Sequence, residues 1–238
     1  MPDADRLPEE SLRFLTDLAA HNEKPWFEAN RERRERDLVE PARALVRRLT
    51  AEIGAVFPEI TGSDAKQGGS LTRLHRDTRF GKDRRPFHSH VGMHFWHRSG
   101  RKTEVPGFFL RVAPDEVLLG TGVHGPEPGP LEKIRRALDA DRKGWEKASR
   151  DPAFLRLWGG LEGECLQRVP APWPADHPFA EDLRRKDFTA FARFRAAEAA
   201  KPGFAAKAVE HWRASGPLMG FLCRATGLDW RPSRPGRS

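Results

Sequence analysis

The stretch that decides the fold is Gly107-Phe-Phe-Leu-Arg-Val-Ala113-Pro-Asp-Glu116-Val-Leu-Leu-Gly-Thr-Gly-Val123. It contains two β-like runs, residues 107–113 and 116–123, and the Ala-Pro-Asp-Glu junction between them has the composition of a tight turn. Two more β-like runs precede it, at residues 70–78 and 87–96, and a looser loop at 98–106 follows the second. Because the connections are short and contain no helix, we expect an antiparallel meander.

Helical patterns flank these strands on both sides. Apolar residues at helical spacing predict helices at residues 9–20, 25–37, 41–57, 131–141, 152–161, 188–200, 204–214 and 217–226. We therefore predict an α+β fold, with an antiparallel meander sheet of about four or more strands in the middle of the chain, packed against N-terminal and C-terminal helices. Since no long polar linker interrupts residues 10–226, we expect a single α+β domain there, followed by a basic, disordered tail at 227–238.

The charge balance favours an anionic partner. The chain has 238 residues and a formal net charge of +8, with 42 lysine and arginine residues against 34 aspartate and glutamate residues. Arginine recognises carboxylate and phosphate groups through two parallel hydrogen bonds. Many charges alternate in sign, however, as at residues 31–37, and that pattern is typical of a solvated helical face.

The two cysteines and the N-terminal sequence indicate the cellular compartment of the protein. Cys165 and Cys223 lie far apart and lack the spacing of a metal site, which is typical of a reduced intracellular protein. No basic start followed by an apolar stretch is seen, and no apolar run approaches the roughly 20 residues that cross a bilayer. We expect a cytoplasmic protein that does not bind membranes.

Residues 73–87 hold the densest group of chemically functional side chains. On an extended strand, Arg73, Asp77 and Arg79 lie on one face and Arg76 lies on the other. Because a guanidinium group is costly to bury without a partner, this concentration indicates a site for a phosphate or carboxylate ligand. The neighbouring arginines are expected to keep Asp77 ionised, as a carboxylate that orients a guanidinium. The predicted ligand-binding residues are Arg73, Arg76, Asp77, Arg79, Phe80, Lys82 and Asp83.

The same segment carries a family resemblance. The motif Arg73-x-x-Arg76-Asp77-x-Arg79-Phe80, followed by a short basic stretch and an aromatic residue, resembles the signature of the bacterial family catalogued as domain of unknown function 2461. The resemblance covers roughly residues 10–226 and includes Asn22, Trp26-Phe27, Gly107-Phe108-Phe109, Gly120-x-Gly122 and Pro217-Leu218-x-x-Phe221-Leu222. It implies a single-domain cytoplasmic protein and no assigned activity.

Two positions depart from that family's pattern. Arg84 stands where the family usually has lysine, and Phe87 stands where it usually has tyrosine. The chain contains no tyrosine at all, which excludes a mechanism based on a phenolic acid or base.

Histidines form a second candidate site. His88, His90 and His94 share one strand face, and a carboxylate such as Asp77 or Asp83 would complete a metal site. Neutral imidazoles are also ordinary on the exposed face of an antiparallel sheet. We predict no metal and no cofactor.

Other motifs are incomplete. Gly120, Gly122 and Gly125 resemble a phosphate-binding loop only loosely and fit a strand end and a tight turn better. Neither cysteine lies in a recognisable nucleophile context, and no Gly-x-Ser-x-Gly motif is present. The catalytic residues are unknown, and the sequence does not decide whether the protein is an enzyme.

Three functions fit these observations. The first is a small-molecule site for a phosphorylated or carboxylated ligand, built on the arginine strand. The second is a nucleic-acid-associated basic protein, which the pI near 10.0 also permits. The third is a structural or interaction domain in which the motif is a lattice of ion pairs, so that Asp77→Ala would unfold the protein. The oligomeric state is left open.

Overall fold

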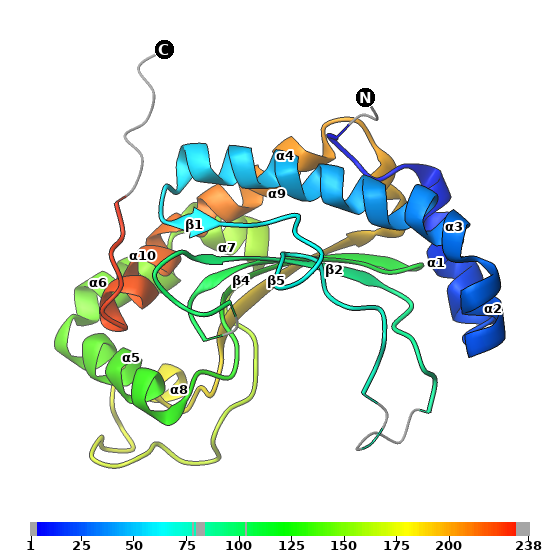
Figure 1. The fold of residues 1–238 in the computed structure, drawn as a ribbon. Helices are drawn as coiled ribbons and strands as arrows, with labels where there is room; N and C mark the ends of the chain where they lie inside the picture. Colours follow the sequence, from blue (N-terminus) through cyan, green and yellow to red (C-terminus); the bar gives the residue numbers. More distant parts are fainter. Residues whose placement is uncertain (1–3, 78, 80–83, 103, 232–238) are drawn as a thin grey trace.

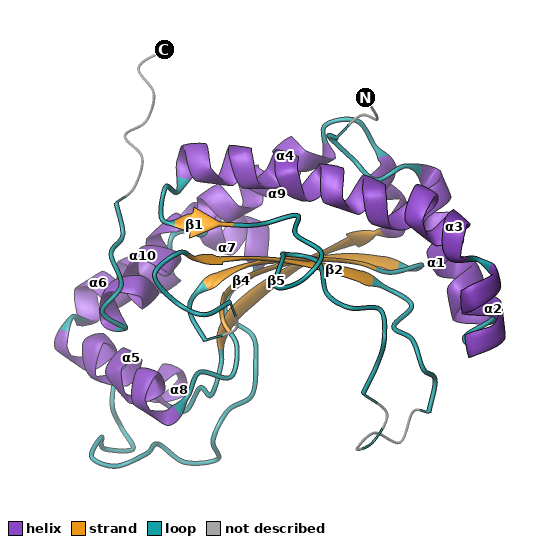
Figure 2. Cartoon of the chain, viewed as in Figure 1, coloured by secondary structure: helices purple, strands orange, loops and turns teal. Residues whose placement is uncertain are grey.

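Five antiparallel strands form one sheet in the order β1-β2-β3-β4-β5 (Figure 2). The structure is a computed structural model, and it describes residues 4–77, 79, 84–102 and 104–231. The strands are β1 (Ile60–Thr61), β2 (Val91–His97), β3 (Gly107–Val112), β4 (Glu116–Val123) and β5 (Phe188–Arg195). With helices at both ends of the chain packed on this sheet, the predicted α+β fold is confirmed (Figure 1).

One face of the sheet packs on helices. In Figure 1, α4 (Glu40–Val56) and α9 (Phe204–Ala214) cross above the strands. The indole ring of Trp212 stacks on Phe108 with the ring centroids 5.3 Å apart, and its N–H donates to the carbonyl oxygen of Gly120 at 3.1 Å. This face therefore contributes the apolar core that fixes the sheet in place.

The N-terminal helices bend at a single turn of π-helix. Helix α1 (Glu9–Ala20) has the predicted bounds, and it is followed by α2 (Lys24–Ala29), α3 (Arg31–Arg34) and the π-turn η1 (Glu35–Val39). Pro41, at the start of α4, has no N–H to donate to the carbonyl of Asp37, four residues before it. The buried hydroxyl of Ser11 donates to that carbonyl instead.

The C-terminal part is mostly helical, as predicted, but its boundaries differ. Its remaining helices are α5 (Pro128–Ala140), α6 (Arg142–Ser149), α7 (Pro152–Trp158), α8 (Ala180–Leu183), the 3₁₀ turn η2 (Ala196–Ala200) and α10 (Gly216–Ala225). A long segment before β5 is fastened to α5 at Asp139, whose carboxylate accepts from Trp173 Nε1 and contacts His177 Nε2, each at 3.1 Å.

Residues 188–200 were predicted to be helical, and this prediction is wrong for most of the segment. Phe188, Phe191 and Phe194 recur every third residue, and the alanines that follow favour helix, so the local pattern resembles a helix. Pairing along the full length of β4 overrides that preference and makes the segment β5.

Residues 70–78 were predicted to be a regular strand, and this prediction is also wrong for residues 70–77, which the structure describes. They pair with residues 86–94 through isolated bridges, Leu71 with Met93 and His75 with Phe87, rather than through a continuous ladder. Four backbone hydrogen bonds of 2.7–3.0 Å hold the two segments together. We call the described residues 70–77, 79 and 84–90 the arm, which projects from the sheet on the side opposite α4 (Figure 1).

None of the helices in the described residues combines the length and the apolar character that a membrane span requires.

Candidate functional site

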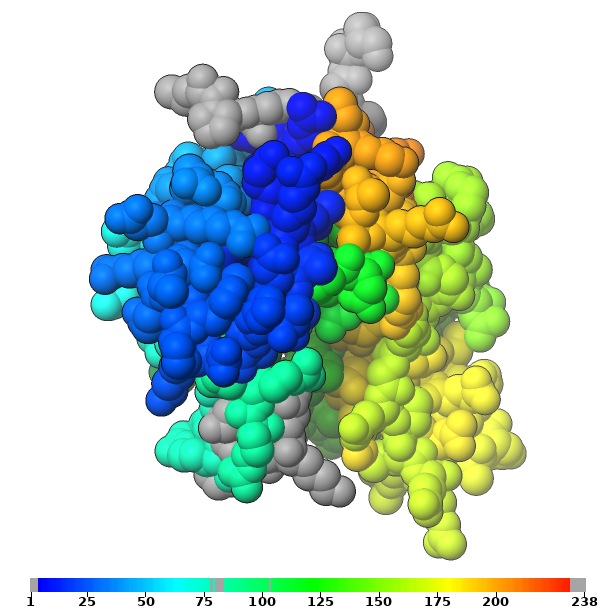
Figure 3. All heavy atoms as spheres, turned by 90° about the vertical axis from the view of Figure 1, so that its right-hand side faces the viewer, coloured from blue at the N-terminus to red at the C-terminus, as the bar shows by residue number. Residues whose placement is uncertain are grey.

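The sheet face turned away from α4 and α9 is the open face of the molecule. The strand registers place its side chains in three rows across β2 to β5: Trp96, Gly107, Gly122 and Thr189; His94, Phe109, Gly120 and Phe191; and Gly92, Arg111, Leu118 and Arg193. The arm stands on one side of this face and residues 159–187 on the other, and the surface is hollowed between them (Figure 3). The open face is therefore a floor between two walls.

A pocket of about 380 Å³ lies on the open face. Its floor is backbone, because Gly107, Gly120 and Gly122 line it without side chains. A Cβ atom at Gly120 would lie 3.2 Å from Cε1 of Phe191 and 3.3 Å from Cβ of Phe109, so these two aromatic residues flank the glycine. The volume fits a small organic ligand.

The pocket walls are mainly apolar and include two polar ends. The imidazole of His94 lies against Phe109, with the ring centroids 4.6 Å apart. Burial, with a smaller contribution from the nearby Lys102, lowers the pKa of His94 to about 4, so this imidazole is neutral at pH 7. The wall thus offers stacking surface rather than charge at this point.

Lys102 brings a cation to one end of the pocket. Its ammonium group donates to the carbonyl oxygens of Gly69 and Ser70, at the base of the arm, and lies 5.7 Å from the centroid of the Trp96 ring. Burial lowers the pKa of Lys102 from its ordinary value. These contacts fix the charge between the pocket and the arm.

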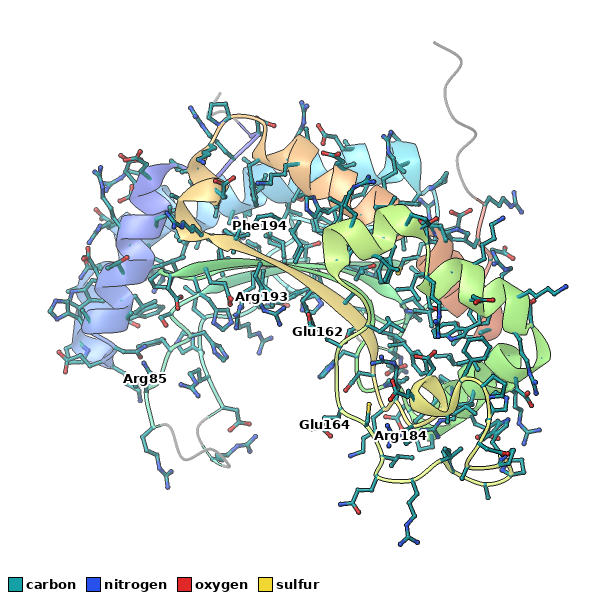
Figure 4. The ribbon with its side chains drawn as sticks, turned by 180° about the vertical axis from the view of Figure 1, so that it is seen from behind. Arg85, Glu162, Glu164, Arg184, Arg193 and Phe194 are labelled. Atoms are coloured by element: carbon teal, nitrogen blue, oxygen red, sulfur yellow. The ribbon has the colours of Figure 1, made fainter. Side chains whose placement is uncertain are left out.

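Two arginines lie in the third row of the open face. Arg111 pairs with Glu116 on the next strand. Arg193 forms two hydrogen bonds of 2.9 Å with Glu162, and its guanidinium lies 5.6 Å from the centroid of the Phe191 ring. Figure 4 shows Arg193 and Glu162 on the open side of β5, with Phe194 on the helix side. Both ion pairs are at least partly exposed, so an incoming anion can compete for these guanidinium groups.

His124 lines the other end of the pocket, and its imidazole contacts Asp187. Asp187 is buried at the start of β5, and its carboxylate lies 3.0 Å from Nδ1 of the exposed His124. The same carboxylate accepts from the backbone N–H groups of Gly125 at 2.7 Å and Glu164 at 2.9 Å. Asp187 therefore ties the end of β4 to the wall formed by residues 159–187.

The base of the arm is fixed to the N-terminal helices. The amide of Asn22 donates to the carbonyl oxygen of Phe87 at 2.9 Å and accepts from its N–H at 3.0 Å, as a neighbouring strand would. The ring of Phe87 stacks on Phe27 with the centroids 3.7 Å apart, and His75 meets both rings edge-on. The arm therefore leaves the sheet in a defined direction.

The predicted arginine site lies further out along this arm. Arg79 donates to Asp77 at 2.7 and 2.9 Å, and its guanidinium holds the pKa of that carboxyl below its ordinary value, so Asp77 is ionised as the spacing predicts. Both side chains are exposed, and water screens such pairs strongly. The contacts of Asp77 thus give no support to a buried ion-pair lattice.

Of the other predicted site residues, Arg73 and Arg76 also lie on the arm. Burial lowers the pKa of His88 and His90, and the charge of the nearby Arg76 contributes to both shifts in the same direction. Arg73 is exposed. None of the described arginines of the arm lines the pocket. Three further predicted site residues lie outside the described residues: Phe80, Lys82 and Asp83.

The histidine cluster is only partly assembled. The rings of His88 and His90 lie 4.9 Å apart, while His94 faces the pocket. Burial lowers the pKa of His90 to about 4. Within the described residues, no group of three or more histidine, cysteine, aspartate or glutamate side chains is placed to hold a metal ion.

The chain matches one family model over most of its length. Residues 10–221 match the model of the family described as "Conserved hypothetical protein (DUF2461)". The chain belongs to this family. No curated protein and no solved structure matches the chain. The DUF2461 match includes both the arm and the whole open face.

Sequence reasoning missed the open face of this DUF2461 protein. The glycines at positions 120 and 122 were assigned to a strand end and a turn, yet they line the pocket with Gly107. A signal was present, since Gly107 and Phe109 alternate with the core residues Phe108 and Leu110. Glycine and aromatic residues at every second position of a strand indicate a face that is shaped for a ligand rather than packed.

Proposed function

We propose that this protein binds a small organic anion that combines a flat apolar group with a phosphate or carboxylate. The flat group enters the pocket on the open face and lies against Phe109 and Phe191, which line it. The anion turns toward the arm, where Lys102 and Arg76 bring positive charge. The observation that carries the proposal is the pocket floored by Gly107, Gly120 and Gly122 beside a basic arm.

The arm is suited to hold such an anion. Residues 73–85 include six lysine or arginine residues against two aspartates. Bidentate guanidinium groups recognise phosphate better than a lysine ammonium does. The arm therefore binds the anionic group of the ligand through charge, and the pocket binds its flat group through shape.

A thermal-shift experiment tests both parts of the ligand. The probes are a nucleoside monophosphate, the matching nucleoside, inorganic phosphate and an aromatic carboxylate. A ligand at 100 times its dissociation constant adds about 2.7 kcal/mol of stability, which is a shift of roughly 5–10 °C at about 2–4 °C per kcal/mol for this size. We expect such a shift from a probe with both parts and little shift from the nucleoside or the phosphate alone.

Matched variants locate the binding. Gly120→Val adds atoms against Phe109 and Phe191, which already lie 3.2–3.3 Å from the position of a Cβ there, and should abolish the shift by displacing the pocket lining. Arg76→Lys should weaken the shift while the protein remains folded, because the charge survives and the fork is lost. Arg213→Lys, on α9 at the helix side, is the control. Equal shifts from the nucleoside and the nucleoside monophosphate would show that the anionic group does not contribute to binding, and that part of the proposal would be wrong. The absence of a shift from every probe would end it.

A further inference from the structure

The open face offers more than one stacking surface. Phe109 and Phe191 stand on β3 and β5 with only Gly120 between them, so their backbones are two strand spacings, roughly 10 Å, apart. Trp96 is a third half-buried ring on the same face. A ligand with one flat group uses one of these surfaces, whereas a ligand with repeated flat groups uses all of them.

The charge on the two walls is unequal. Among the residues that the structure describes, the arm carries five arginines and one aspartate, whereas residues 159–187, on the opposite wall, carry four basic and six acidic residues. Figure 4 shows the contrast, with Arg85 on one side and Glu162 and Glu164 on the other. An extended polyanion would therefore run along the arm and turn its uncharged parts toward the sheet.

We infer that the ligand of the open face is a segment of single-stranded nucleic acid. This inference rests on the proposed function and names its substrate class. Bases stack on Phe109, Phe191 and Trp96, while the phosphates follow the arm. The width from β2 to β5 is three strand spacings, or roughly 14 Å, which suits two or three bases, as on other sheets that bind single strands.

The recessed position of the rings favours a single strand over a duplex. Phe109 and Phe191 are half-buried at the floor between two walls. Bases that are paired and stacked inside a duplex do not expose their flat surfaces to such a floor, whereas unpaired bases do. The duplex is therefore the informative competitor.

Fluorescence anisotropy tests this inference. The probes are a labelled eight-nucleotide oligo(U) and oligo(dT), a labelled hairpin duplex of the same phosphate count, and the unlabelled mononucleotide as competitor. We expect the single strands to bind at least tenfold more tightly than the mononucleotide and the hairpin. Their affinity should fall with salt, with a log–log slope of about −0.7 per phosphate contacted.

Variants on the two faces of β5 give a matched comparison. Phe191→Ala should weaken oligonucleotide binding about five- to 100-fold, the effect of losing one base-stacking contact. Phe194→Ala removes the same side chain from the helix side of the same strand and should leave binding unchanged. Arg84→Gln should lower the salt slope by about 0.7, whereas Arg213→Gln on α9 should not.

The outcomes separate the two proposals. Tight binding of the mononucleotide with no gain for the oligonucleotide would overturn the single-strand inference and leave the proposed function standing. Equal binding of the hairpin, or equal effects of Phe191→Ala and Phe194→Ala, would also overturn it. No binding of any probe at low salt would overturn both.

Discussion

At the scale of single residues, charge on the open face depends on which groups are buried. His94 sits in the pocket wall with Lys102 as its charged neighbour, and burial with this cation lowers its pKa to about 4. His94 is therefore a neutral stacking and hydrogen-bonding group. Asp77, in contrast, is exposed and kept ionised by Arg79. Only the state of Asp77 was predicted from the sequence, because its partner lies two residues away, whereas the burial of His94 depends on strands far apart in the chain.

The lowered pKa of His94 predicts acid sensitivity. Between pH 6.5 and about 4, the unfolded chain binds a proton at this histidine and the folded protein does not, so the free energy of unfolding falls as the pH falls. We expect His94 to remove about 1 kcal/mol at pH 5 relative to pH 7, after allowance for its partial exposure. Urea unfolding of the wild type and His94→Gln at both pH values measures this effect. An unchanged pH dependence in the variant would contradict it.

At the scale of elements, the predictions are correct where the local sequence pattern determines the structure, and they are wrong where pairing with a distant segment determines it. Helix α1 and strand β4 follow from their own sequences, and both have their predicted bounds. Strand β5 and the arm do not, since β5 is imposed by β4, and the arm is held at Phe87 by Asn22, which lies between α1 and α2 and is 65 residues away in sequence. The arm was predicted as a candidate site because of its composition, while the pocket beside it required the strand registers.

The contact between Asn22 and Phe87 predicts the stability of the arm. Asn22→Ala leaves the N–H and the carbonyl of the buried Phe87 without these partners, which should cost about 1–3 kcal/mol. Thermal unfolding should show a melting temperature lowered by a few degrees, and hydrogen exchange should show faster exchange of the Phe87 amide. The control is Asn30→Ala, whose amide bonds only the nearby carbonyl of Trp26 at 2.9 Å. Equal effects of the two substitutions would show that Asn22 does not fix the arm.

At the scale of the whole molecule, one apolar cluster joins the two ends of the chain. It extends from Leu7 through the sheet to Leu222, and Trp212 links it to the backbone of the open face at Gly120. The walls of the open face are thus attached to a shared core, the arm through α2 and residues 159–187 through α5 and β5. A ligand on the open face would be held by parts of the chain that fold together.

This shared core predicts a single unfolding transition for residues 10–226. Tryptophan fluorescence and far-UV circular dichroism should give the same midpoint in urea, because six of the seven tryptophans and the helices lie within these residues and are expected to unfold as one cooperative unit. Separate midpoints would show that the helices after β4 unfold independently of the sheet, and the single-domain prediction would then be wrong.

The glycine at position 120 sets a limit on how the pocket can evolve. Glycine has the smallest side chain, so every mutation there adds atoms between Phe109 and Phe191 and makes the pocket smaller. Descendants of this protein can therefore acquire a preference for smaller ligands by changing one codon. A preference for larger ligands has to arise through the aromatic neighbours, where truncation also removes stacking surface. Size selectivity on this face is easy to tighten by mutation and difficult to relax.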